Sequence, residues 1–197
     1  MKKSILQKSA ELFLKYGFKS VTMDEIASEL GISKKTIYAN FETKPLLIRE
    51  ATFFVFDEIN EGITQICSAN FTPIEEFYEI KSLVSRQLNN EESQPMYQLQ
   101  KYYPRIHKEL HEKQLNLVKT CVSDNLKKGI SLGLYRKEID INFITRIYFN
   151  GVIGIKNMDL FPLEEFSSSN LMDSFLDYHL RAIATEKGLD QLTKIQK

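Results

Sequence analysis

Apolar residues recur every three or four positions along almost the whole chain, and this spacing most constrains its fold. No segment alternates apolar and polar residues as a half-buried strand does. Glycine and proline number only 8 and 5 among 197 residues, which disfavours sandwiches, barrels and glycine-rich phosphate loops. We therefore expect an all-α protein of about nine helices.

Capping signals place the helices near the amino end. Thr22 and Glu25 form a capping-box pattern at the start of a short helix, and Ser33 can cap a second short helix that ends near Phe41. Pro45 suits the first turn of the helix that follows. Helical patterns cover 3–16, 73–89, 95–128 with a break at Pro104, 139–159 and 168–187, and we expect frayed residues after 187.

Residues 22–41 read as a helix-turn-helix, two short helices joined by a turn that contains Gly31. In such a unit the second helix shows one face to the DNA major groove and packs its back on the other helices. Ile37 and Phe41 form that back. The front offers short polar, phenolic and cationic groups: Lys34, Lys35, Thr36, Tyr38, Ala39 and Asn40. The alternative reading is a compact three-helix core with a solvated lysine pair.

The charge distribution modestly supports the DNA-binding reading. The chain has 26 basic and 26 acidic residues, so nucleic-acid binding needs a local basic face. Residues 1–44 hold a net charge of +3 and the remainder holds −3. The excess positive charge therefore falls where the second short helix lies.

The residues that carry a family resemblance run from Ile5 to Leu47 and include Tyr16-Gly17-Phe18, Thr22-Met23, Leu30-Gly31-Ile32-Ser33 and Thr36-Ile37-Tyr38. Over about residues 3–50 the chain resembles the N-terminal domain of TetR/AcrR-family transcriptional regulators. The rest is similar to that family only in its length and helical character. The resemblance implies a helix-turn-helix DNA-binding domain over 1–46 and a larger helical bundle for ligand binding and dimerisation over 47–197.

The same resemblance implies a homodimer that places two recognition helices on a pseudo-palindromic operator of double-stranded DNA, with half-sites ~34–36 Å apart. The DNA-binding residues that it implies are Thr22, Ser33, Lys34, Lys35, Thr36, Tyr38, Asn40 and Lys44. Family members often have glycine or alanine at the position of Lys35 and histidine at that of Asn40. Lys35 could therefore read guanine or add a phosphate contact.

The segment 139–159 is apolar nearly all round, so it needs cover on more than one side. A thick monomer core could supply that cover, or a partner subunit could. The resemblance favours the partner, because the last two long helices of each TetR-family chain form the dimer interface.

The resemblance also implies a small hydrophobic or amphipathic effector inside the larger domain. The aromatic and soft side chains there would line its site, although they could equally be plain core. The candidate ligand-binding residues are Phe54, Met96, Tyr97, Tyr103, His107, Phe149 and Ile153.

No catalytic set, metal cluster or cofactor motif is visible in the sequence, so we expect no enzyme activity and no cofactor. His107 and His111 lie four residues apart, but the glutamate between them is at the wrong offset for HExxH. Cys67 and Cys121 do not make a disulfide scaffold, and Cys121 reads as a small buried hydrophobe. With no signal peptide or membrane span visible, we expect a cytoplasmic protein.

The sequence thus predicts a ligand-responsive, sequence-specific DNA-binding regulator, a repressor released from its operator by the effector. One alternative is a helical interaction protein that has lost DNA binding. Another is a small all-α enzyme that uses His107 with a nearby carboxylate.

Overall fold

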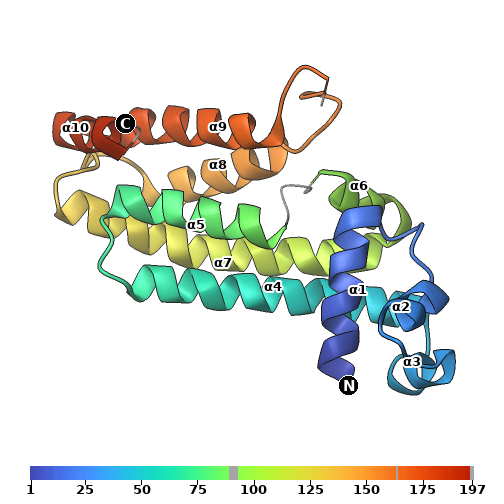
Figure 1. The fold of residues 1–197 in the computed structure, drawn as a ribbon. Helices are drawn as coiled ribbons and strands as arrows, with labels where there is room; N and C mark the ends of the chain where they lie inside the picture. Colours follow the sequence, from blue (N-terminus) through green and yellow to red (C-terminus); the bar gives the residue numbers. More distant parts are fainter. Residues whose placement is uncertain (89–92, 163, 196–197) are drawn as a thin grey trace. The chain divides into compact units, whose positions relative to one another are not determined.

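The computed structural model describes residues 1–88, 93–162 and 164–195. Apart from one isolated bridge between Tyr135 and Ala184, the regular secondary structure of these residues is helical, so the all-α prediction is confirmed. The helices are α1 (Lys2–Tyr16), α2 (Met23–Glu29), α3 (Lys34–Asn40), α4 (Lys44–Ser68), α5 (Pro73–Gln87), α6 (Ser93–Tyr102), α7 (Pro104–Ser131), α8 (Ile141–Gly154), α9 (Ser168–Ile183) and α10 (Glu186–Ile195) (Figure 1). No helix of the described residues is long and apolar enough to cross a membrane.

The chain packs as two compact units. Unit 1 comprises residues 1–60 and 87–112, and unit 2 comprises 61–86 and 113–197. The predicted domains, 1–46 and 47–197, follow chain order, whereas packing groups α6 and the first turns of α7 with the helix-turn-helix. The functional division at residue 46 therefore stays a prediction.

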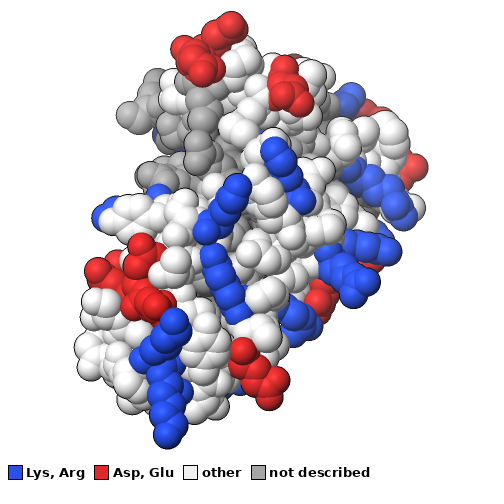
Figure 2. Space-filling model, turned by 90° about the vertical axis from the view of Figure 1, so that its right-hand side faces the viewer, with Lys and Arg blue, Asp and Glu red and all other residues white. Residues whose placement is uncertain are grey.

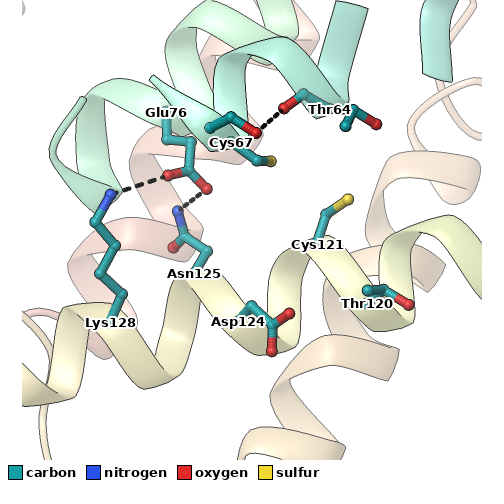
Figure 3. A pocket seen from close by; sticks show the side chains of 9 residues that line it. Thr64, Cys67, Glu76, Thr120, Cys121, Asp124, Asn125 and Lys128 are labelled. Atoms are coloured by element: carbon teal, nitrogen blue, oxygen red, sulfur yellow. Dashed lines mark hydrogen bonds and ion pairs between the residues drawn. The ribbon is translucent and has the colours of Figure 1, made fainter. Parts of the chain in front are cut away.

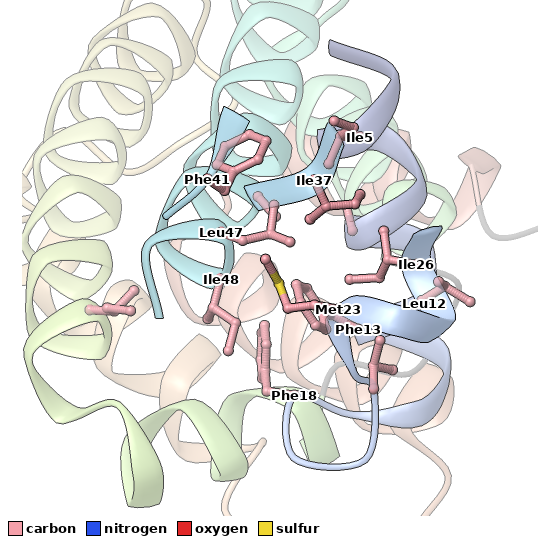
Figure 4. Packing of buried hydrophobic residues seen from close by; sticks show 14 of the residues in the cluster. Ile5, Leu12, Phe13, Phe18, Met23, Ile26, Ile37, Phe41, Leu47 and Ile48 are labelled. Carbon is pink, nitrogen blue, oxygen red and sulfur yellow. The ribbon is translucent and has the colours of Figure 1, made fainter. Parts of the chain in front are cut away.

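The core of unit 1 holds α1, α2 and α3 together. Ile5 and Phe13 of α1, Ile26 of α2 and Ile37 of α3 are at most 1% exposed, as is Phe41 just after α3 (Figure 4). Fully burying such side chains stabilises a fold by roughly 1.5–3 kcal/mol each. The predicted back of the second short helix is therefore confirmed.

The helix ends of unit 1 follow their capping residues. The Thr22 hydroxyl accepts the backbone N–H of Glu25 at 3.2 Å, and the Glu25 carboxylate accepts the backbone N–H of Thr22 at 2.6 Å, which completes the predicted capping box. Ser33 caps α3 by accepting the backbone N–H of Thr36 at 3.1 Å. These caps satisfy donors that the first turn leaves unpaired, and they fix where each short helix begins.

Two polar contacts tie α6 and α7 to the rest of unit 1. Gln98 of α6 accepts the backbone N–H of Lys19 at 3.2 Å and covers Gly17, where a Cβ atom would lie 2.5 Å from the Gln98 amide nitrogen. Gly17 also has φ 82, a conformation that favours glycine. Arg49 of α4 holds Glu109 of α7 through two hydrogen bonds, at 2.6 and 3.1 Å.

Unit 2 is a helical bundle with its own apolar core. Leu126 of α7, Leu176 and Leu180 of α9 and Leu192 of α10 are fully buried in it, and Tyr135 is 1% exposed. Helices α8 and α9 end at Gly154 and Ile183, earlier than the predicted ends at 159 and 187.

The expectation of a frayed tail after residue 187 is wrong, because α10 continues to Ile195. Gly188 has the features of a helix stop, but it lies inside α10, where a Cβ atom would come within 2.2 Å of the Leu134 carbonyl oxygen. Its backbone N–H donates to the Thr185 hydroxyl at 3.2 Å. The glycine thus permits close packing, and Leu192 one turn later anchors the helix.

Candidate nucleic-acid interface

Helix α3 turns an apolar back to the core and a polar front to solvent. Ile37 is fully buried, whereas Lys34, Lys35 and Ala39 are exposed and the Tyr38 ring is 42% exposed. Figure 2 shows basic and acidic side chains interspersed on one face of the molecule. The front predicted from the sequence is therefore exposed at these positions.

Lys34 is already engaged within unit 1. Its ammonium pairs with the Asp24 carboxylate at 2.8 Å and lies 5.9 Å from the centre of the Tyr38 ring. The hydrogen bond to Asp24 raises the pKa of the Lys34 ammonium. Both side chains are exposed, so this ion pair is worth little in water and a phosphate can replace the carboxylate. Sequence reasoning missed Asp24, because a ten-residue separation leaves no helical spacing to find it.

No described residue forms an ion pair with Lys35, which leaves its ammonium available to a ligand. Thr36 and Asn40 are half-buried and use part of their polar groups locally. The Thr36 and Ser33 hydroxyls are hydrogen-bonded at 2.9 Å, and the Asn40 amide donates to the Thr36 carbonyl at 2.8 Å. This local network orients both side chains along one edge of α3.

Thr22 and Lys44 lie at helix starts and have structural partners. Thr22 is exposed, and its hydroxyl belongs to the capping box of α2. Lys44 is half-buried, and its ammonium donates to the Lys19 carbonyl at 3.2 Å. Burial lowers the pKa of the Lys44 ammonium, while the Glu25 carboxylate opposes that shift.

The candidate ligand-binding residues are divided between the two units. Five lie in unit 1 and two, Phe149 and Ile153, lie in unit 2. Met96 and Tyr103 pack against the core of unit 1, and Phe149 is 7% exposed. The five in unit 1 are Phe54, Met96, Tyr97, Tyr103 and His107.

Among the described residues, a pocket of about 270 Å³ lies wholly within unit 2. None of the candidate ligand-binding residues lines it. Its polar wall centres on Glu76, which is 4% exposed, accepts the Asn125 amide at 3.0 Å and pairs with Lys128 at 3.5 Å (Figure 3). The lining residues are Thr64, Cys67, Ser68, Glu76, Thr120, Cys121, Asp124, Asn125 and Lys128. The expectation that Cys121 is a buried hydrophobe is wrong, because its half-exposed side chain lines this pocket.

The two histidines of α7 stack on each other, with ring centres 6.3 Å apart. Burial lowers the pKa of His107, and the neighbouring His111 adds to the shift. Within the described ranges, no three His, Cys, Asp or Glu side chains are grouped so that they could hold a metal ion.

Comparisons with known proteins indicate the family that the sequence of the helix-turn-helix resembles. Residues 5–51 match the model of the bacterial regulatory proteins, tetR family. The HTH-type transcriptional regulator YerO of Bacillus subtilis (strain 168), itself uncharacterized, is 23% identical over 171 residues. That match covers 78% of this chain but only 58% of YerO, so the chain spans less than two thirds of this relative.

Solved structures share the fold. A transcriptional regulator from Cytophaga hutchinsonii is similar with a TM-score of 0.74 and 18% identity, covering 93% of this chain and 98% of that one. The SmeT–triclosan complex is similar with a TM-score of 0.67 and 14% identity, covering 94% and 92% of the two chains. The match over residues 5–51 identifies a tetR-family helix-turn-helix at the amino end, and these likenesses show that the chain shares the fold of solved transcriptional regulators.

Proposed function

We propose that this protein is a sequence-specific DNA-binding repressor that leaves a pseudo-palindromic operator when a small hydrophobic effector binds. The observation that carries the proposal is the front of α3, where Lys34, Lys35 and Tyr38 stand exposed over a fully buried Ile37. Regulators of the TetR family are transcription factors without catalytic activity, so a catalytic role for His107 is set aside.

Within this proposal the side chains have different tasks. Lys35 and Thr36 enter the major groove and contact base edges, because they lie in the first turn of α3. Lys34 and Tyr38 bind phosphates. The Lys34 ammonium exchanges its ion pair with Asp24 for a phosphate when DNA binds. Four side chains stabilise the ends of the short helices and contact the DNA backbone beside them: Thr22, Ser33, Asn40 and Lys44.

The homodimer forms through α8 and α9 in this proposal. A single chain leaves three large apolar side chains of these helices exposed: Phe143 at 58%, Ile147 at 45% and Tyr178 at 74%. Phe143 and Ile147 lie one turn apart on α8, and apolar side chains that share an exposed helix face are typical of an interface between subunits. A monomer whose core covered α8 on all sides would not expose Phe143 and Ile147.

The effector is proposed as an apolar or amphipathic molecule. The similar fold of SmeT is described in complex with the compound triclosan, which supports an effector site in a protein of this fold. The candidate residues stay a proposal from the sequence, with Phe54, Met96, Tyr97, Tyr103 and His107 in unit 1 and Phe149 and Ile153 in unit 2. A thermal-shift screen of lipophilic compounds tests this part, and it fails if no compound stabilises the protein.

Fluorescence anisotropy tests DNA binding directly. The protein is titrated into labelled duplexes from the region upstream of its own gene and into a random duplex of equal length, at several salt concentrations. We expect tighter binding to one upstream duplex, with an affinity that falls steeply as salt rises, because lysine–phosphate contacts release counterions. Equal and weak binding to all duplexes would support instead a helical interaction protein that has lost DNA binding.

A further inference from the structure

The two cysteines of the chain meet in the pocket of unit 2, although 54 positions separate them in sequence. Cys67 lies near the end of α4 and Cys121 lies in the second half of α7, and both are half-buried. Figure 3 shows their sulfur atoms on neighbouring helices beside the same hollow. The fold therefore brings together two thiols that sequence spacing gave no reason to pair.

The two thiols differ in acidity. The neighbouring Cys67 thiol lowers the pKa of Cys121, because it favours the Cys121 thiolate. The neighbouring Cys121 thiol and burial raise the pKa of Cys67. Cys121 is thus the better nucleophile of the pair, and Cys67 stands beside it with its proton.

We propose that Cys67 and Cys121 form a redox-active dithiol that reacts with hydrogen peroxide or a small organic hydroperoxide to give an intramolecular disulfide between α4 and α7. Both side chains line the same pocket from neighbouring helices, so side-chain rotation is the movement that brings the two sulfur atoms toward the S–S length of about 2 Å. The pocket of about 270 Å³ beside them admits a small oxidant. Intracellular disulfides of this kind are usually transient and redox-sensing.

The reaction has two steps. The Cys121 thiolate attacks one peroxide oxygen, so that an S–O bond forms, the O–O bond breaks and hydroxide leaves to take up a proton as water. Cys67 then attacks the Cys121 sulfenic acid, so that the S–S bond forms, the S–O bond breaks and a second water leaves, carrying the proton of Cys67. In sum two thiols are oxidised and one peroxide is reduced to two waters.

The test uses the full chain and needs no DNA, so its failure is distinguishable from a failure of DNA binding. The reduced protein is treated with hydrogen peroxide at neutral pH, denatured, and its free thiols are counted. We expect both thiols to disappear together, the mass to fall by two hydrogen atoms, and a non-reducing tryptic digest to contain residues 50–81 joined to 120–127. Dithiothreitol should restore both thiols.

Two single variants separate the roles. Cys67→Ala should leave Cys121 to stop at a sulfenic acid that dimedone labels, which the wild type does not accumulate. Cys121→Ala should leave a Cys67 that reacts far more slowly than the wild-type pair. Circular dichroism verifies that both variants are folded. The tryptic digest of the oxidised wild type tests the disulfide independently of either variant.

Three results would overturn the proposal. One is oxidation of each cysteine separately to sulfinic acid, without the joined peptide. Another is a disulfide only between two chains. The third is a Cys67 in Cys121→Ala that reacts as fast as the wild-type pair.

Discussion

His179 makes the sharpest stability prediction. Its imidazole in α9 is 5% exposed and lies among three aromatic rings, with centres at 5.0 Å (Tyr148), 5.9 Å (Phe175) and 6.0 Å (Phe77). Its Nε2 atom has no hydrogen-bond partner in the described part of the chain. This burial lowers the pKa of His179 from 6.5 to about 4.

The lowered pKa makes unit 2 less stable as the pH falls. Between pH 6.5 and 4 the unfolded chain binds a proton at this residue and the folded chain does not, so the free energy of unfolding decreases with falling pH. The linkage amounts to about 2 kcal/mol between pH 7.5 and 5, and about 3 kcal/mol once pH 4 is reached. Stability is fully present above pH 6.5.

Urea denaturation followed by circular dichroism, at intervals from pH 7.5 to 5, measures this loss. His179→Leu cannot titrate, so its unfolding free energy should fall by about 2 kcal/mol less than that of the wild type over this range. Leu132→Ala, at an exposed residue of the same unit, removes no titratable group and is the control; it should keep the wild-type pH dependence. If His179→Leu and the wild type lose the same stability on acidification, the argument from a buried neutral imidazole is refuted.

Three further predictions follow from the interface, the carboxyl-terminal helix and the exposed face of α8. Thr36→Ala should cost about 1–3 kcal/mol on the operator and little on random duplex, and equal losses in anisotropy titrations would argue against base contact. Leu192→Ala should destabilise the fold to urea by about 2–5 kcal/mol, whereas exposed Leu132→Ala stays within about 0.5 kcal/mol. Phe143→Glu should give monomers in light scattering, unlike Leu160→Glu in the exposed connection, and a Phe143→Glu dimer would exclude α8 from the interface.

Local signals carried most of the information about unit 1. The capping box at Thr22 and the buried pair Ile37 and Phe41 involve residues within a few positions of one another, and a pattern over that distance is readable in a single sequence. The partner of Lys34 was not readable, because Asp24 reaches it through the turn between two helices.

The features that could not be predicted from the sequence depend on contacts between residues far apart in the chain. Gly188 lies inside α10 because the Leu134 carbonyl, from a distant loop, leaves no room there for a Cβ atom. The approach of Cys67 to Cys121 likewise depends on how α4 packs on α7. Helical periodicity predicts the side of a helix on which a residue lies, but it does not predict which residue of another helix will contact it.

We propose that two copies of α3 read one duplex at a separation of one turn. Hydroxyl-radical footprinting of the protein on its operator tests this most directly. We expect two protected half-sites whose centres are about 10 base pairs apart, and Lys35→Ala should weaken the protection of both together. A single protected patch, or protection that Lys35→Ala leaves unchanged, would contradict it.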